Sequence, residues 1–253
     1  MRLEGKVAIV TGAGAGLGQA VAKRFALEGA RVVVAEINAC DGEATVQDIQ
    51  RSGGDSVFVQ TDVSQEQDVR AMVAAASQRY GGVDILYHNA AVLQHKKEAR
   101  AHELTAEVWD YTVSVNLRGA WICSKYSIPP MLNRGGGSII HVASCAGILG
   151  FRKLTAYSAS KGGVLGLMRA MAADYAPDNI RVNALVPGTM NTAMNAEELS
   201  DPQMREHLIA GIPLGRVGDP QDITGLAVFL ASDESAFCTG GIYFVDGGRS
   251  ATV

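Results

Sequence analysis

Three side chains near the middle of the chain have the types and the spacing of a proton-transfer centre. Tyr157 and Lys161 are four residues apart in a segment without a helix breaker, so on a helix they lie on one face, one turn apart. We expect the Lys161 ammonium to lower the Tyr157 pKa from its usual ~10 toward neutrality. Ser144 closes an apolar run typical of a buried strand, from which its hydroxyl can reach the same place. These groups together suit proton transfer at a carbinol or carbonyl oxygen.

Taken alone, this spacing is a weak signal, because a tyrosine and a lysine so placed are usually a packed ring beside a solvated amine. Cys145 is a candidate nucleophile, but no histidine partner is evident nearby in the sequence, and we interpret it as a small packed residue. Asn116, in VSVNLRG, falls in the middle of a predicted helix, where asparagine is a mediocre helix former. It either holds a water at a kink or is an exposed polar residue.

Short apolar runs alternate with longer amphipathic segments along nearly the whole chain, which is typical of a parallel α/β sheet. The predicted strands are Val7–Val10, Arg31–Ala35, Val57–Val59, Val83–Tyr87, Ser138–Val142, Arg181–Val186 and Ile242–Val245. The predicted helices cover 17–28, 41–51, 65–80, 105–132, 155–175 and 220–231. We therefore predict one Rossmann-like, doubly wound domain over residues 1–253, with about seven parallel strands and helices on both faces.

A glycine-rich turn, TGAGAGLG, follows the first predicted strand and opens a helix. Glycine at positions 12, 16 and 18 lets the backbone approach a pyrophosphate at a helix N-terminus, where free N–H groups and the helix dipole favour an anion. An isolated turn of this kind is also compatible with no ligand, and the rest of the chain must decide.

Glu36 ends the second predicted strand, eighteen residues beyond Gly18. A carboxylate there can accept hydrogen bonds from both ribose hydroxyls of a dinucleotide and would repel a 2′-phosphate. Neither Ala15 nor Ile37 is an arginine or lysine that would offset this repulsion. The pattern favours NAD over NADP, although a solvated glutamate at a strand end would look the same.

Other candidate cofactor contacts follow later strands. Asp62 and Val63 are expected to close the third strand beside an adenine edge. Pro187 and Gly188 follow the sixth strand, and with Thr192 they offer groups that can grip a nicotinamide carboxamide. Residues 189–213 are Met-rich and weakly patterned, and we interpret them as a mobile lid over the substrate.

Composition narrows the class of protein. The chain has 253 residues, 47% hydrophobic and 19% charged, with a net charge of −4 and no basic block, which argues against nucleic acid or a membrane surface as partner. The apolar run near the N-terminus is too short for a signal peptide or a membrane span. The four cysteines are far apart, so we expect free thiols and a cytoplasmic protein. The histidines lack ligand spacing, and no metal site is predicted.

Together these motifs resemble the short-chain dehydrogenase/reductase family over essentially the whole chain. Thr11-Gly12, Gly16-Leu17-Gly18 and Asn89-Ala90 look like its cofactor motifs, and Asn116, Ser144, Tyr157 and Lys161 match its catalytic tetrad. Pro187-Gly188 with Thr192 resembles its nicotinamide clamp, and Val245-Asp246-Gly247-Gly248 its C-terminal signature. Two positions depart from the usual N-N-A-G motif, with His88 in place of the first Asn and Ala91 in place of Gly.

The resemblance implies an NAD-dependent interconversion of a secondary alcohol and a ketone. Tyr157 would exchange the proton, Lys161 would lower its pKa and hold the nicotinamide ribose, Ser144 would bind the substrate oxygen, and Asn116 would position a relay water. The resemblance also implies a homotetramer. Candidate substrate-pocket residues are Leu93, Gln94, Ala146, Leu149, Phe151, Met190 and Met194. They suit a moderately apolar hydroxyl compound such as a sugar or polyol, a cyclic alcohol or a steroid.

Two other functions stay open. The alternative enzyme is an NADPH-linked reductase of the 3-oxoacyl-carrier-protein type. Glu36 argues against it, because it disfavours NADPH. The acidic residues Asp174 and Asp178 also argue against it, because an acidic carrier protein binds to a basic surface. A dinucleotide-binding protein without turnover is the alternative outside enzymes, and the departures at His88 and Ala91 are its only support.

Overall fold

Seven strands form one fully parallel sheet in the order β3-β2-β1-β4-β5-β6-β7. The computed structural model describes residues 1–252. The strands are β1 (Val7–Thr11), β2 (Arg31–Glu36), β3 (Ser56–Gln60), β4 (Ile85–His88), β5 (Gly137–Val142), β6 (Ile180–Pro187) and β7 (Ile242–Val245). The chain starts at the centre, runs to the β3 edge, and returns through β4 to the β7 edge. This order confirms the predicted doubly wound fold.

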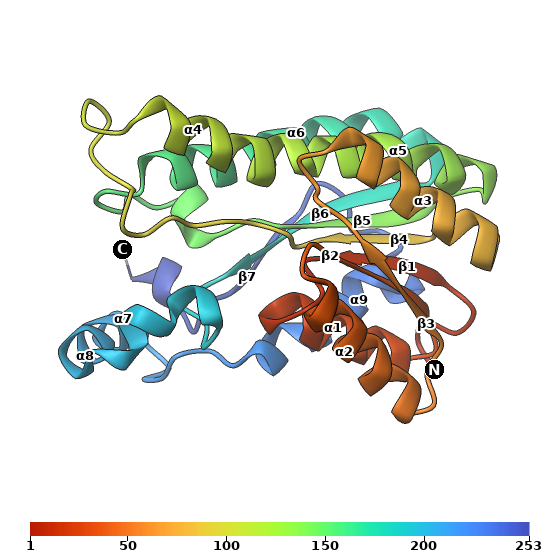
Figure 1. Ribbon diagram of the computed structural model, residues 1–253, viewed down its shortest axis with the longest axis horizontal. Coiled ribbons are helices and arrows are strands. Elements are labelled where there is room, and N and C mark those ends of the chain that lie inside the picture. Colours follow the sequence, from red (N-terminus) through yellow and green to blue (C-terminus); the bar gives the residue numbers. More distant parts are fainter. Residues whose placement is uncertain (253) are drawn as a thin grey trace.

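Helices cover both faces of the sheet (Figure 1). They are α1 (Gly16–Leu27), α2 (Ala39–Arg51), α3 (Glu66–Tyr80), α4 (Ala106–Val113), α5 (Gly119–Asn133), α6 (Thr155–Tyr175), α7 (Ala196–Ser200), α8 (Pro202–Ala210) and α9 (Thr224–Ala231). In the view of Figure 1, α3, α4, α5 and α6 lie above the sheet, and α1, α2 and α9 lie below it. The short helices α7 and α8 project from the lower left, away from the sheet.

The central strands are apolar on both sides because each side meets a different core. In β1, Val7 and Ile9 pack into the core shared with α3, α5 and α6, whereas Ala8 and Val10 pack into the core shared with α1 and α9. All four are fully buried. Burying a valine or isoleucine side chain contributes about 1.5–3 kcal/mol, so both layers hold the sheet in place. This explains the missing in/out alternation in the sequence.

Several predicted boundaries were wrong in ways that affect the site. The helix predicted over 105–132 is α4, a π-helical turn at Ser114–Arg118 and then α5. The helix predicted over 220–231 begins as a 3₁₀ turn at Pro220–Ile223 before α9. β3 ends at Gln60, so the next two residues of interest, Asp62 and Val63, lie in the following loop rather than closing the strand.

Two further differences concern the segments beside the predicted catalytic residues. β5 ends at Val142, and Ser144 lies beyond it, where its hydroxyl accepts a hydrogen bond from the N–H of Ala146 and caps a 3₁₀ turn. Ser144 is therefore held by its own turn and not by the sheet. The predicted weakly patterned lid, 189–213, contains the helices α7 and α8, in which no residue is fully buried. Within the described residues, no helix combines the length and the apolar character needed to cross a membrane.

Candidate active site

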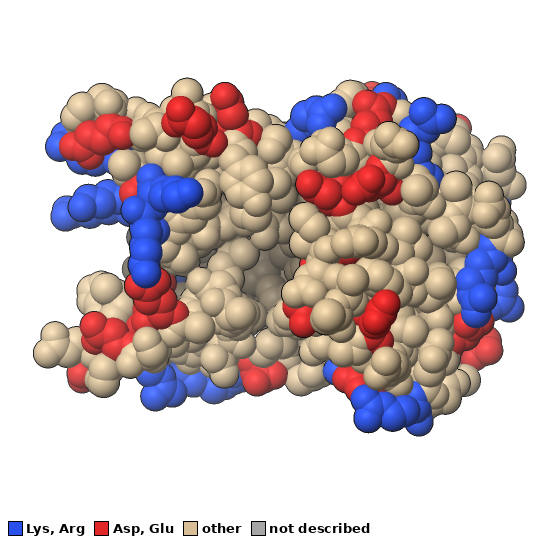
Figure 2. All heavy atoms as spheres, viewed as in Figure 1, with Lys and Arg blue, Asp and Glu red and all other residues tan. Residues whose placement is uncertain are grey.

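One large cleft, of about 870 Å³, lies at the carboxyl ends of the strands, where the strand order reverses between β1 and β4. Open α/β sheets bind ligands at this position. Figure 2 shows it as a hollow in the middle of the face, with α7 and α8 below its left part (Figure 1). The predicted site residues that line it are Gly12, Gly16, Leu17, Glu36, Asp62, Val63, Asn89, Ser144, Tyr157, Lys161, Pro187, Gly188 and Thr192.

Two predicted site residues, Gly18 and Asn116, do not line the cleft. They lie behind its lining and support it. A Cβ atom at Gly18 would lie 2.1 Å from the carbonyl oxygen of Gly12 and 2.6 Å from Nδ2 of Asn89. Only glycine lets α1 approach the turn this closely. The Asn89 amide holds the turn from below, donating to the carbonyl oxygens of Thr11 at 3.3 Å and Gly12 at 3.1 Å.

The N-terminus of α1 fits a pyrophosphate. Its first turn contains no acidic residue, and the residue before it, Ala15, supplies no side-chain cap. Gly12 and Gly16 both have positive φ angles, 63° and 55°, which bring the backbone around the end of the helix. The N–H groups of this helix end therefore face a cleft with the chemistry that an anion requires.

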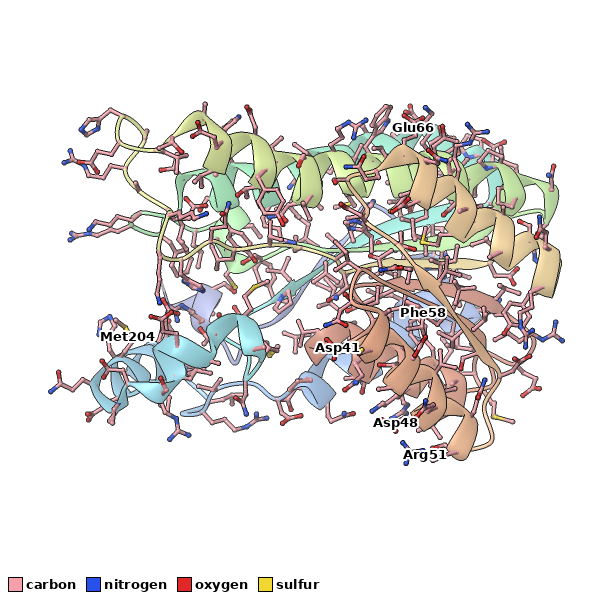
Figure 3. All side chains as sticks on the ribbon, viewed as in Figure 1. Asp41, Asp48, Arg51, Phe58, Glu66 and Met204 are labelled. Atoms are coloured by element: carbon pink, nitrogen blue, oxygen red, sulfur yellow. The ribbon has the colours of Figure 1, made fainter. Side chains whose placement is uncertain are left out.

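Glu36 ends β2 as predicted, and backbone groups fix its carboxylate. Oε2 accepts a hydrogen bond from the N–H of Gly14 at 3.0 Å, and Oε1 accepts from Ile37 at 2.8 Å and Asn38 at 3.1 Å. Asp41 lies at the start of α2, with its Cβ 2.8 Å from where a Cβ of Gly14 would be (Figure 3). A fixed negative charge thus stands on the cleft wall nearest β2.

Tyr157 and Lys161 share one face of α6, as their spacing predicts. The Lys161 Nζ atom lies 5.8 Å from the centre of the Tyr157 ring and donates a hydrogen bond to the carbonyl oxygen of Val142 at 2.8 Å. Both side chains are more than 90% buried. The end of β5 therefore anchors the ammonium beneath the phenol, and Ser144 joins them from the turn that follows.

The pKa of Tyr157 is raised in the structure, whereas its spacing from Lys161 predicted a lowered pKa, so the predicted direction was wrong. Burial raises the pKa of Tyr157 to about 12, and hydrogen bonding with Ser144 lowers it by a smaller amount. Burial also lowers the pKa of Lys161 to about 8. Desolvation disfavours the charged form of each group, and it is the largest cause of both shifts.

Asn116 lies in the π-helical turn between α4 and α5 and is fully buried. Its Nδ2 donates to the carbonyl oxygen of Val92 at 2.9 Å and to Oγ of Ser160 at 3.1 Å, while its Oδ1 accepts from the N–H of Val92 at 2.8 Å. Ser160 in turn donates to the carbonyl oxygen of Tyr157. The side chain of Asn116 therefore ties the loop after β4 to α6, and it is not exposed.

His88 and His141 form a buried pair beneath Lys161. They are opposite each other in the register of β4 and β5, and their ring centres are 5.7 Å apart. Burial, together with the Lys161 charge, lowers the pKa of His141 to about 4, and the pKa of His88 is well below its usual value for the same main reason. Both rings are therefore neutral at physiological pH and packed in the core.

Glu98 is a residue that sequence reasoning missed. The run HKKEARAHE, residues 95–103, has the composition of a solvated surface, but Glu98 within it is only 7% exposed. Its carboxylate accepts hydrogen bonds from the N–H groups of Ala156 at 3.1 Å and Tyr157 at 2.7 Å. Leu154, the residue before α6, gives no side-chain cap. Glu98 replaces that cap from 58 residues away, a contact that no local pattern reveals.

The predicted lid is attached to the loop after β4. His95 and Lys96 lie 3.4 Å and 3.1 Å from the carboxylates of Glu198 and Glu197, and His95 Nε2 is 3.1 Å from the carbonyl oxygen of Met194. Met204 of α8 also lines the cleft (Figure 3). The predicted pocket residues Leu93, Ala146, Phe151, Met190 and Met194 line the cleft, whereas Gln94 and Leu149 do not.

Comparisons with known proteins agree with this geometry. A family model described as enoyl-(acyl carrier protein) reductase matches residues 12–250. A probable short-chain type dehydrogenase/reductase, blr2146 of Bradyrhizobium diazoefficiens, is 42% identical over 256 residues, which cover 100% of this chain and 90% of that protein. The chain belongs to the short-chain dehydrogenase/reductase family.

Two further relatives of this short-chain dehydrogenase/reductase show how varied the family is. The 3-oxoacyl-[acyl-carrier-protein] reductase FabG of Thermotoga maritima is 38% identical and covers 98% of this chain and 99% of its own length. A gluconate 5-dehydrogenase from Burkholderia cenocepacia, solved in complex with NADP and tartrate, has a TM-score of 0.94 and is 32% identical, over 100% of this chain and 98% of its own. Membership makes the protein an oxidoreductase whose family binds a nicotinamide dinucleotide.

The cysteines of this short-chain dehydrogenase/reductase are unbridged, and its described residues show no cluster suited to a metal ion. All four cysteines are free thiols, and burial raises the pKa of Cys145 to about 11, which suits a packed residue rather than a nucleophile. Over residues 1–252, no cluster of three or more histidine, cysteine, aspartate or glutamate side chains is placed to hold a metal ion.

Proposed function

We propose that this short-chain dehydrogenase/reductase interconverts a secondary alcohol and a ketone with NAD(H), using Tyr157 as general acid and base. The observation that carries the proposal is the convergence of three buried or anchored groups, Ser144, Tyr157 and Lys161, on one cleft that also contains an uncapped helix N-terminus. When bound, the nicotinamide supplies hydride exchange with the carbinol carbon.

In this proposal each side chain has one task. Ser144 orients the substrate oxygen by a hydrogen bond, and Tyr157 passes a proton to or from that oxygen. Because burial raises the Tyr157 pKa to about 12, the phenol is protonated at neutral pH and ready to donate to a ketone. Lys161 places a positive charge beneath the ring and stabilises the phenolate once the proton has left. Asn116 and Ser160 hold the helix that carries the phenol.

NAD is the cofactor that we propose, with Glu36 as the selecting residue. Its carboxylate is fixed by three backbone N–H groups at the end of β2, and neither Ala15 nor Ile37 brings a cation beside it. A fixed anion at this place disfavours a 2′-phosphate. The solved relative that holds NADP shows that the choice must be measured for this chain.

The substrate lies, in this proposal, between Ser144 and the segment 189–213, which closes over it as a lid. No residue of α7 or α8 is buried, which supports a movable lid over the substrate. Among the substrate classes expected from the pocket residues, we favour a sugar or polyol derivative. This choice is in keeping with the gluconate dehydrogenases among the structural neighbours.

We also propose a homotetramer. Large apolar side chains are exposed on α4 and α5, namely Trp109, Trp121 and Leu132, and Phe244 is exposed on the edge strand β7. Exposed apolar residues gathered on helices and at a sheet edge suit interfaces between copies. Light scattering on the purified protein tests this, since a monomer would contradict it.

A screen of secondary alcohols and hydroxy acids with NAD and with NADP at alkaline pH tests the proposed function. Reduced cofactor is followed by absorbance, and kcat/KM is compared for the two cofactors on any active substrate. We expect turnover with a clear NAD preference. Cofactor binding without turnover across the panel would favour the non-catalytic alternative. An NADPH preference with a 3-oxoacyl substrate would favour the carrier-protein reductase, to which the relative FabG at 38% identity gives some weight.

A further inference from the structure

Arg249 is a cation that the proposed reaction does not use, at the end of the cleft beyond Ser144. Its side chain lines the cleft together with the proposed catalytic residues. The guanidinium carbon lies 5.1 Å from the centre of the Phe151 ring, and Nη1 lies 3.3 Å from Oγ1 of Thr189. The first of these contacts comes from the segment after Ser144 and the second from the segment after β6, so Arg249 lies where the two walls of the substrate region meet.

The turn that carries Arg249 is rigid. The Asp246 carboxylate accepts hydrogen bonds from the N–H groups of Gly248 at 2.9 Å and Ser250 at 2.8 Å, one on each oxygen. Gly248 has φ of 89°, the left-handed conformation that glycine tolerates best. The backbone on both sides of Arg249 is therefore fixed, and its side chain starts from a defined position.

Within residues 1–252, no ion pair involves Arg249. Asp246 is a near carboxylate, but its two oxygens are taken by backbone groups. Glu198, which also lines the cleft, is paired with His95. A half-buried guanidinium whose protein contacts are an aromatic face and a hydroxyl keeps donors available for an anion, and its planar fork matches a carboxylate.

Charge along the cleft wall differs with position, although Glu198, in the segment after β6, is a carboxylate at the end that carries most of the cations. The carboxylates of Glu36 and Asp62 follow β2 and β3, at one end of the sheet order. The cations Arg152, Lys153 and Arg249 belong to segments after β5 and β7, at the other end. Figure 2 shows Lys and Arg side chains together with Asp and Glu side chains at the left end of the molecule. Arg152, Lys153 and Arg249 thus add positive charge to this end of the cleft in a protein whose net charge is −4.

We infer that the substrate is a small hydroxy or oxo acid whose carboxylate binds Arg249 while its carbinol or carbonyl carbon lies at Ser144 and Tyr157. This rests on the proposed function and narrows its substrate class to organic anions. The reaction is the same oxidoreduction, with the carboxylate unchanged, so no further reactant is required. Arg152 and Lys153, both exposed at the rim, add attraction at longer range.

Matched substrates and variants test the inference. D-gluconate is compared with sorbitol, and 3-hydroxybutanoate with 3-hydroxybutanamide, so that each pair differs at the acid group. The wild type is compared with Arg249→Gln and Arg249→Lys, and Arg205→Gln on α8, which does not line the cleft, is the control. Binding of all four compounds in the presence of NADH is measured by calorimetry, which needs no turnover.

For the wild type, we expect kcat/KM to be higher for each acid than for its neutral partner. We also expect the acids to bind the wild type. Arg249→Gln should lower kcat/KM for the acid about 10- to 100-fold, the effect of a charge-assisted hydrogen bond, and leave the neutral compound and NADH binding unchanged. Arg249→Lys should lose less, and Arg205→Gln nothing. Equal handling of acid and neutral partner by the wild type, or an equal loss of both in Arg249→Gln, would overturn the inference.

The two proposals fail in distinguishable ways. Turnover of neutral alcohols without any preference for acids leaves the proposed oxidoreduction standing and refutes the role of Arg249. Binding of an acid that depends on Arg249, without turnover of any compound, supports the anion site and refutes the proposed reaction. If none of the four acid and neutral compounds binds the wild type with NADH, the inference is refuted as well.

Discussion

The Glu98 cap of the catalytic helix leads to a prediction whose size follows from the structure. Replacing Glu98 with Ala removes both acceptors of the Ala156 and Tyr157 N–H groups and leaves these donors buried at the start of α6. Loss of an N-cap costs about 1 kcal/mol, and loss of hydrogen bonds to a charged group in a buried place costs about 1.5–3 kcal/mol. These figures describe overlapping interactions, so we expect Glu98→Ala to lower the free energy of unfolding by about 2–4 kcal/mol.

Glu98→Gln separates geometry from charge. The amide keeps one acceptor oxygen but presents an NH₂ group to the second N–H, so we expect a loss of about 1–2 kcal/mol. Turnover should fall in both variants by more than NADH affinity does, because the displaced group is the backbone of Tyr157 itself. Urea unfolding followed by circular dichroism gives the stability, and fluorescence titration gives the NADH affinity.

Glu103→Gln is the matched control for this experiment, since Glu103 lies in the same loop with its side chain 46% exposed. A surface change of this kind should stay within about 0.5 kcal/mol of the wild type. If Glu98→Ala were as stable and as active as Glu103→Gln, the carboxylate would not be a cap and the reasoning would be refuted.

Three further predictions concern the cofactor loop, the selecting carboxylate and the buried ammonium. Gly18→Ala should weaken NADH binding at least tenfold, because its Cβ would lie 2.1 Å from a backbone carbonyl oxygen. The control Gly166→Ala, whose Cβ would meet nothing within 4 Å, should leave NADH affinity unchanged and leave the fold as stable or more stable. Equal NADH affinities of the two variants would contradict this. Glu36→Ala should reduce the ratio of kcat/KM for NADH over NADPH, and Glu43→Ala, exposed on α2, should not. The stability of Lys161→Met should be compared with that of the wild type across pH. Burial lowers the Lys161 pKa to about 8 in the folded protein, so between about pH 8 and pH 10.5 the unfolded chain binds more protons than the folded one. The wild type should therefore gain stability relative to the variant as pH rises over this range. A constant difference in unfolding free energy across that range would refute the last prediction.

The sequence was sufficient for the fold and for the groups that face the cleft because both follow from local patterns. Apolar runs between amphipathic segments identify the parallel strands, and the strand ends then place Gly12, Glu36 and Pro187 at one edge. Tyr157 and Lys161 meet because their spacing is that of one helical turn. These features depend on neighbours in the chain, and the sequence records them directly.

Features that depend on distant parts of the chain were missed. The charged run around Glu98 looks solvated until α6 is placed over it, 58 residues later. The π-helical turn contains Asn116, whose hydrogen bonds to Val92 and Ser160 join segments far apart in the chain. The Tyr157 pKa was misjudged because sequence spacing shows the nearby ammonium but not the burial that outweighs it.

The central claim is that Tyr157 exchanges the proton, and Tyr157→Phe tests it most directly. The phenyl ring keeps the packing of a side chain that is 8% exposed and loses only the hydroxyl. On a substrate found by the screen, kcat should fall by about 10²–10⁴-fold while NADH affinity by fluorescence titration stays near that of the wild type. Wild-type turnover in Tyr157→Phe would contradict the account.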